Sequence, residues 1–206
     1  MIERSSVKRR IGDAAVGPEF SGPRFALWGA FLGVLLLGAC AHHTNPAQEL
    51  NSAVAPFTDS RDQTIRLIAQ EKHSLGAADV NSLAVAYTSL EEKANAYAHF
   101  LVVSVSSASL SADQDNQCAS DLTAAINTFN KAFAGIVPSK QTASVVSSAW
   151  VVPFATNVAA YWGKYGAAIG GMSSQAKADL TDQLRNKTLW PNFEDIATEP
   201  LATPPH

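Results

Sequence analysis

The chain has 206 residues and a formal net charge of −3, with 47% hydrophobic and 16% charged residues. This composition is typical of a globular protein that buries a core, and it excludes the highly charged, weakly hydrophobic class of disordered chains. Residues 40–206 hold ten Lys or Arg against fifteen Asp or Glu. Because this part is acidic and has no basic patch, we do not expect nucleic acid as a partner.

An apolar run from Phe25 to Leu36 follows a positively charged flank. Residues 1–24 hold five basic and three acidic side chains, and the run leads into the string Leu37-Gly38-Ala39-Cys40. A positive flank, an apolar core and small residues at a cleavage point are the layout of a secretory signal. The string resembles the lipobox of bacterial lipoprotein precursors.

This resemblance implies that residues 1–39 are a signal peptide, removed by cleavage before Cys40, and that Cys40 carries the lipid. More than one acyl chain is needed for stable attachment to a membrane, and a diacylated or triacylated cysteine meets that need. Ala41 follows the cysteine, and in Gram-negative lipoproteins this implies an outer-membrane protein facing the periplasm. An uncleaved membrane anchor is the alternative, because the apolar run is close to the minimum length of a span.

The spacing of apolar residues predicts an all-α domain, an antiparallel four-helix-type bundle with a short C-terminal helix and an irregular tail. We expect the lipidated cysteine and its tether at 40–58, the bundle at 59–197 and a disordered tail at 198–206. Within these regions the predicted helices span residues 47–54, 61–74, 79 to beyond 101, 112–136, 140–169 and 175–186.

The strongest periodic signal lies in the helix that begins at Asp79. Its apolar residues recur in alternating steps of three and four, which is a heptad seam. The seam consists of Val80, Leu83, Tyr87, Leu90, Ala94, Tyr97 and Leu101. In the following helix Cys118 lies on the apolar face, so we expect a buried, inert thiol. Once Cys40 is acylated, Cys118 has no partner for an intrachain disulfide.

The stretch from Gln141 to Gly163 contains no charged residue. Polar side chains are scattered through it and Pro153 interrupts it, so a buried bundle helix kinked at the proline is favoured over a membrane span. A helix from Trp150 to Trp162 that acts on membranes is a further alternative. Near its end, Gly166-Ala-Ala-Ile-Gly170 has the small-xxx-small spacing that lets helices approach closely.

Trp190 and Phe193 follow the last predicted helix, and we expect them to pack back on the bundle. If they are exposed, they are the candidate interaction surface. The sequence contains no Glu-x-x-His pair, no Gly-x-Ser-x-Gly and no phosphate-binding glycine loop, and the adjacent His42 and His43 have no third ligand nearby. We therefore expect no catalytic residues, no metal and no cofactor, and a non-enzymatic protein.

These features together favour a lipid-anchored periplasmic protein that acts as an interaction or assembly-accessory module with an envelope protein as its partner. In size and architecture it is loosely similar to all-helical pilotins and toxin-antagonising lipoproteins, which is an analogy of fold alone. The alternative is a carrier, in which the inward-facing aromatic residues line a cavity for a small apolar ligand. These residues are Tyr87, Tyr97, Trp150 and Trp162.

Overall fold

The structure is a computed structural model that describes residues 45–136 and 146–198. The predicted signal peptide, Cys40, the start of the tether and residues 199–206 of the predicted tail lie outside the described residues. The described part contains helices and no strand, which confirms the all-α prediction. The helices are α1 (Pro46–Glu71), α2 (Ala77–Ser107), α3 (Ala112–Ile136), α4 (Val151–Gly170), α5 (Ser174–Thr188) and α6 (Phe193–Thr198).

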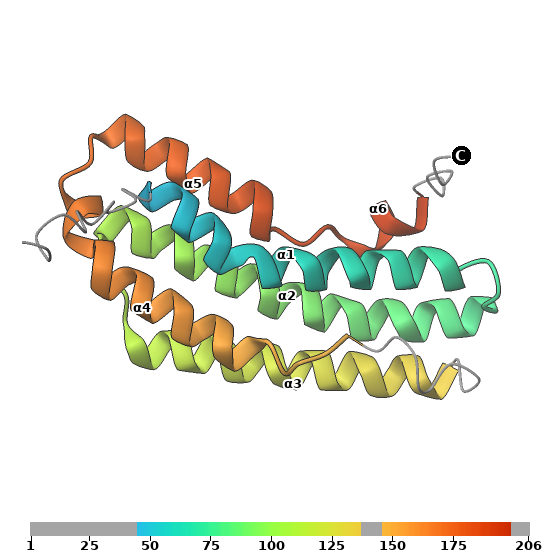
Figure 1. Cartoon of the computed structure of the whole chain (residues 1–206). Helices are drawn as coiled ribbons and strands as arrows, with labels where there is room; N and C mark the ends of the chain where they lie inside the picture. The colour runs from blue at the N-terminus through green and yellow to red at the C-terminus, as the bar shows by residue number, and fades with distance from the viewer. Residues whose placement is uncertain (1–44, 137–145, 199–206) are drawn as a thin grey trace, which may run out of the picture. The chain divides into compact units, whose positions relative to one another are not determined.

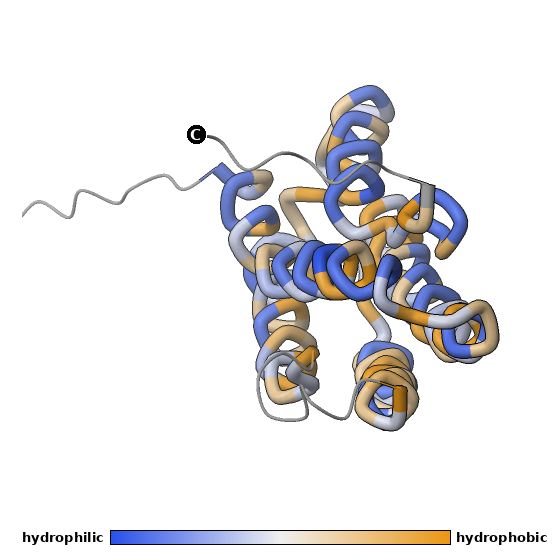
Figure 2. The backbone as a smooth tube through the Cα atoms, turned by 90° about the vertical axis from the view of Figure 1, so that its right-hand side faces the viewer, coloured by the Kyte–Doolittle hydropathy of each residue, from blue (hydrophilic) through white to orange (hydrophobic). Residues whose placement is uncertain are grey.

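The first four helices form an antiparallel bundle (Figure 1). Helix α3 packs on α2 and α4, and α4 packs on α1. Helix α5 contacts both α1 and α2, and α6 lies on α1. We call the end where α1 begins, with the α2–α3 and α4–α5 turns, the Asn45 end, and the end with the α1–α2 turn the Gly76 end. Figure 2 looks along the bundle from the Gly76 end.

Helix α1 is one continuous helix through Pro56, whereas the sequence predicted a short helix ending there. Leu50, Val54 and Phe57 on either side of the proline are each 0% exposed, so packing holds this segment in the bundle. The predicted tether at 40–58 is therefore wrong from residue 46 onward. Figure 1 shows that α1 changes direction along its length, as expected where a proline removes a helical hydrogen bond.

Helix α4 begins at Val151, and residues 146–150 are not helical. The predicted start near residue 140 lies outside the described residues. Pro153 therefore occupies the first turn of α4, where its missing N–H has no helical partner to lose. The expected kink in mid-helix is wrong for this reason.

The heptad seam of α2 is confirmed. Six of its seven members are buried and Val80 is partly buried. The core beside it is aromatic, with Phe57 at its centre. The rings of Tyr97, Trp150, Phe154 and Trp190 lie with their centroids 5.6–6.4 Å from that of Phe57.

The glycines of the small-xxx-small motif pack against the α2–α3 turn. A Cβ added to Gly166 would lie 3.4 Å from the carbonyl oxygen of Ala108, and one added to Gly170 would lie 3.6 Å from Ala108 Cβ. Ala108 itself has a left-handed backbone (φ 53°), so the chain turns sharply at the point of closest approach. The motif thus serves close packing within the domain. Among the described residues, no helix is both long and apolar enough to cross a membrane.

Candidate functional site

Trp190 does not form a surface, because its side chain is 1% exposed. The side chain of Asn95 accepts a hydrogen bond from the Trp190 N–H at 2.8 Å and donates one to the Trp190 carbonyl at 3.3 Å. Tyr87 donates to the Pro191 carbonyl at 2.7 Å, and the partly buried Phe193 ring lies 5.8 Å from the Tyr87 ring. The pair packs back on the bundle as expected, and Trp190 as an interaction residue is wrong.

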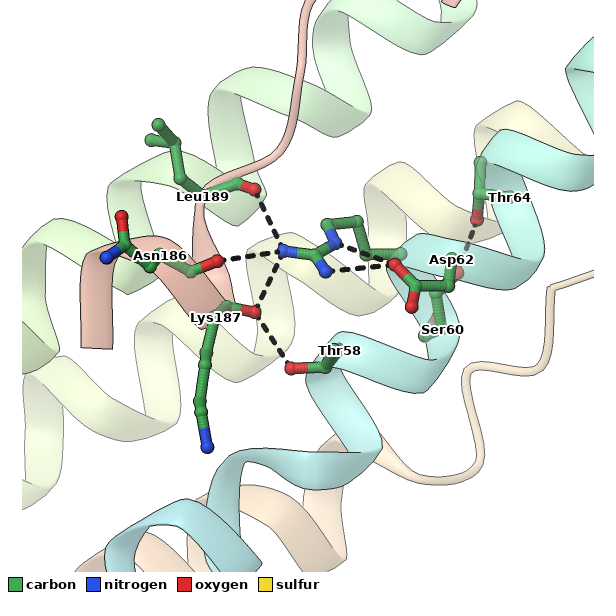
Figure 3. Close-up of polar contacts among 8 residues, drawn as sticks. Thr58, Ser60, Asp62, Thr64, Asn186, Lys187 and Leu189 are labelled. Carbon is green, nitrogen blue, oxygen red and sulfur yellow. Dashed lines mark hydrogen bonds and ion pairs between the residues drawn. The ribbon is translucent and has the colours of Figure 1, made fainter. Parts of the chain in front are cut away.

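The end of α5 is also fixed to the bundle, through side chains of α1 (Figure 3). Thr58 Oγ1 donates to the Lys187 carbonyl at 2.8 Å, and Arg61 Nη1 donates to the same carbonyl at 3.1 Å. Arg61 Nη1 also reaches the carbonyls of Asn186 and Leu189, each at 3.4 Å. These carbonyls lack donors within α5, so α1 supplies the cap that a helix C-terminus requires. The segment is a structural part of the domain.

A buried polar pair joins α2 to the first turn of α3. Tyr97 donates a hydrogen bond to the carboxylate of Asp115, which is 2% exposed. Burial raises the pKa of Asp115, and the hydrogen bond from Tyr97 lowers it by less. Burial also raises the pKa of the nearby Cys118 thiol. A raised thiol pKa disfavours the nucleophilic thiolate, as expected for an inert cysteine.

Cys118 is only partly buried, so the prediction of a buried thiol holds in part. It lines a shallow groove with Phe100 and Val103, beside His99, which is exposed. In the part of the chain that the structure describes, no three His, Cys, Asp or Glu side chains are grouped as metal ligands would be. The adjacent His42 and His43 lie outside that part.

The exposed side of α4 is the surface that sequence reasoning missed. In the 20 residues of this helix Lys164 is the sole charged residue. Val152 is 67% exposed on it. Apart from Lys164, and from Gly170 at the end of the helix, the other exposed positions are all uncharged: Pro153, Thr156, Asn157, Ala159, Ala160, Gly163, Ala167 and Ala168. We call these residues, with Val152 and Lys164, the α4 face.

Two grooves flank the α4 face. The first, of about 500 Å³, lies between α3 and α4 and is lined by small and polar side chains. These include Asn116, Ser120, Thr123 and Asn127 of α3, with Val152 and Thr156 of α4. The groove therefore offers amide and hydroxyl groups but no charge.

The second groove, of about 370 Å³, lies between the start of α1 and the second half of α4. The Lys164 ammonium forms an ion pair with Glu49 at 2.9 Å and lies 4.8 Å from the centroid of the Tyr165 ring. Tyr161 lines the groove and is 5% exposed, and its hydroxyl oxygen is itself buried without a hydrogen-bond partner. Burial raises the pKa of Tyr161 to about 12, so this hydroxyl stays protonated.

The aromatic residues that a ligand cavity would require are used in packing. Tyr87 and Tyr97 are 0% exposed and Trp162 is 6% exposed, while Trp150 is partly buried. Each lies against another ring of the core, and for Trp162 that ring is Tyr161, with the centroids 5.2 Å apart. Comparison with known proteins gave no match to a family model, to a curated protein or to a solved structure.

Proposed function

We propose that this protein is a lipid-anchored interaction module of the cell envelope, which binds a neutral helical segment of another envelope protein through the α4 face. The observation that carries this proposal is an exposed helix with a single charged residue, flanked by two grooves. Solvent-exposed helices ordinarily carry charged residues on their outer side. An outer side that lacks them indicates a surface that is covered in use.

The composition of the α4 face suits a helix as its partner. The centres of protein interfaces are depleted of charged residues, because a buried charge loses its hydration. Small side chains such as Ala160 and Gly163 let a second helix approach closely.

The membrane attachment in this proposal rests on the lipobox-like string that ends at Cys40. With Ala41 after the cysteine, the expected location in a Gram-negative host is the outer membrane, with the domain in the periplasm. A carrier function has less support, because the aromatic residues that would line its cavity pack against one another in the core. Membrane action by α4 also has less support, because the aromatic side chains that would enter a membrane, Phe154, Tyr161 and Trp162, are buried in the domain.

The test is site-specific photo-crosslinking in living cells. A photoreactive residue replaces Ala160 on the α4 face, and in a matched control it replaces Ala178, an exposed alanine of α5. We expect one discrete crosslinked protein from position 160, none from position 178, and loss of the product when Cys40 is changed to Ser. The same set of products from both positions would contradict binding through α4.

Two further variants separate the parts of the proposal. Ala160→Arg places a charge on the α4 face and should abolish binding of the crosslinked partner, whereas Ala178→Arg should leave binding intact. Both positions are exposed, so neither change should alter thermal stability appreciably. An unchanged membrane fraction in Cys40→Ser, with no lipid label on the wild type, would refute the anchor alone.

A further inference from the structure

We propose that the Asn45 end of the bundle faces the membrane and rests against the lipid headgroups. This inference rests on the proposed anchoring through Cys40. It concerns the end of the bundle, which meets the α4 face at Ala167 and Ala168, whereas helix α4 itself runs along the side of the bundle (Figure 1).

The two turns at the Asn45 end carry no charged residue, and the charges nearest to them lie in the first turns of α1, α3 and α5, at Glu49, Asp113, Asp115 and Lys177. No charged residue occurs from Phe100 to Ala112 or from Tyr165 to Ala176. These segments contain the α2–α3 and α4–α5 turns. Because Gly166 and Gly170 approach Ala108, the two segments form one continuous surface. Asp113 at the edge of this surface is the first charged residue of α3.

Helices α1, α3 and α5 all begin at this end, and each is capped by a neutral side chain. Asn45 Oδ1 accepts from the Ala47 N–H at 3.0 Å, Ser111 Oγ from the Gln114 N–H at 3.4 Å, and Ser173 Oγ from the Ala176 N–H at 3.2 Å. Aspartate is as good an N-cap as serine or asparagine and also favours the helix dipole. The three caps therefore satisfy the helix N-termini without adding a charge to this end.

Three serine hydroxyls near the end of α2 donate to the protein itself. Ser104, Ser106 and Ser107 donate to carbonyls one turn earlier in α2, at 2.9, 3.3 and 3.0 Å. These donors do not depend on water, so the surface can approach a membrane without leaving them unpaired. Leu110 and Met172, partly buried apolar residues in the two turns, suit the boundary between headgroups and acyl chains.

The Gly76 end has the opposite character. Lys72, His73 and Asp79 surround the α1–α2 turn, and the exposed Glu194 and Asp195 lie nearby in α6, whose Ile196 and Ala197 carbonyls accept from Lys72. Charged groups lose hydration free energy when they approach a low-dielectric medium, whereas neutral groups with satisfied hydrogen bonds do not. The contrast between the ends therefore favours contact of the Asn45 end with the bilayer.

The covalent chain brings the same end to the membrane. Asn45 follows Cys40 by five residues, a length that spans at most about 18 Å. Helix α2, with 31 residues, is about 46 Å long and separates the Asn45 end from the Gly76 end. A lipidated Cys40 thus keeps the Asn45 end beside the bilayer, while the Gly76 end extends into water.

Fluorescence quenching on vesicles tests this orientation. The full chain is expressed, processed and purified with its lipid anchor, with Cys118→Ala in every variant. A fluorescent label is attached to Ser174→Cys at the Asn45 end or to Ala78→Cys at the Gly76 end, both exposed and each in the first turn of a helix. The vesicles contain phosphatidylethanolamine and phosphatidylglycerol with a nitroxide-labelled headgroup.

We expect the label at position 174 to lose most of its fluorescence, and the label at position 78 to be unaffected. Equal quenching at both positions, or none at either, would overturn the orientation. A label at Gln175, which is also exposed, replaces position 174 if that variant fails to fold. Failure of the protein to float with the vesicles would instead refute the anchor itself, so the two proposals fail by different results.

Discussion

Tyr97 donates a hydrogen bond to the carboxylate of Asp115 in the interior of the bundle. Tyr97 is 0% and Asp115 2% exposed, so neither group gains much from water. The pair links Tyr97, near the end of the α2 seam, to the first turn of α3. A buried acid with a raised pKa makes the stability of the fold depend on pH.

The pH dependence has a definite sign. Burial raises the pKa of Asp115 in the folded protein above its unfolded value, despite the opposing hydrogen bond from Tyr97. The stabilising contribution of this group is therefore fully present below the unfolded pKa, and it is lost as the pH rises through the folded-state pKa. We expect Asp115→Asn to gain stability relative to wild type as the pH rises from about 4 to about 7. Urea unfolding at both pH values measures this, and parallel pH profiles would contradict it.

Tyr97→Phe should destabilise the protein at neutral pH. It leaves the Asp115 carboxylate buried with one hydrogen bond fewer, which costs about 1–3 kcal/mol. The loss of stability caused by Tyr97→Phe should be smaller in an Asp115→Asn background. A buried neutral amide loses less free energy than a buried carboxylate when its hydrogen-bond donor is removed. A double-mutant cycle of unfolding free energies measures the coupling, and strictly additive effects would show that the pair does not interact.

Arg61→Met should weaken the attachment of α5 to α1. The change removes the donor that serves the carbonyls of Asn186, Lys187 and Leu189 while keeping an apolar side chain of comparable length. Hydrogen bonds to a charged donor contribute about 1.5–3 kcal/mol, so a loss in this range is expected in chemical unfolding.

Arg185→Met is the control for Arg61. Arg185 is 60% exposed and is paired with the exposed Asp182 at 3.8 Å. Exposed ion pairs of this kind contribute between about 0 and 1 kcal/mol. Equal losses in the two variants would mean that Arg61 acts only as a surface charge.

The helices of the bundle could be predicted because their signals are local. The seam from Leu83 to Leu101 follows from apolar spacing, and the bounds 112–136 follow from that spacing together with Ser111 or Asp113 as a helix start and Pro138 as a stop. The sequence predicts a helix at 47–54 but not its continuation through Pro56, because proline is unfavourable inside a helix. The spacing of Leu50, Val54 and Phe57 continues in helical register across the proline, and that signal was present in the sequence.

The α4 face could not be predicted, because it depends on neighbours from elsewhere in the chain. The sequence showed that α4 lacks charge, and this indicated a buried helix. In the fold α3 and α1 cover only its inner side, so Val152 and Ala160 remain exposed. Likewise, the sequence predicted that Trp190 packs back on the bundle, but it could not show that Asn95 and Tyr87 hold the Trp190 segment in place.

Trp190→Ala should be far more destabilising than Phe193→Ala. Trp190 is 1% exposed and packs against Phe57 and Tyr87, so its removal should cost about 3–5 kcal/mol. Phe193 is only partly buried, so Phe193→Ala should lower the free energy of unfolding by less. Thermal and urea unfolding distinguish the two variants, and a Trp190→Ala protein of wild-type stability would return Trp190 to the candidate interaction residues.

Ala108→Gly should stabilise the protein. Ala108 has φ 53° and ψ 26°, a left-handed conformation that costs a residue with a Cβ roughly 1–2 kcal/mol. Glycine adopts this conformation without that cost, although it loses the methyl contact near Gly170 and has more freedom in the unfolded chain. We expect a net gain of about 0.5–1 kcal/mol, which for a domain of this size raises the Tm by about 1–4 °C.

The same substitution at a right-handed position gives the opposite expectation. Ala167 is an exposed residue in the last turn of α4, and Ala167→Gly should destabilise by about 0.5–1 kcal/mol because glycine is unfavourable within a helix. Differential scanning calorimetry of the two variants against wild type measures both shifts. If Ala108→Gly lowers the Tm as Ala167→Gly does, the packing of the Ala108 methyl group against α4 outweighs the backbone strain at the α2–α3 turn.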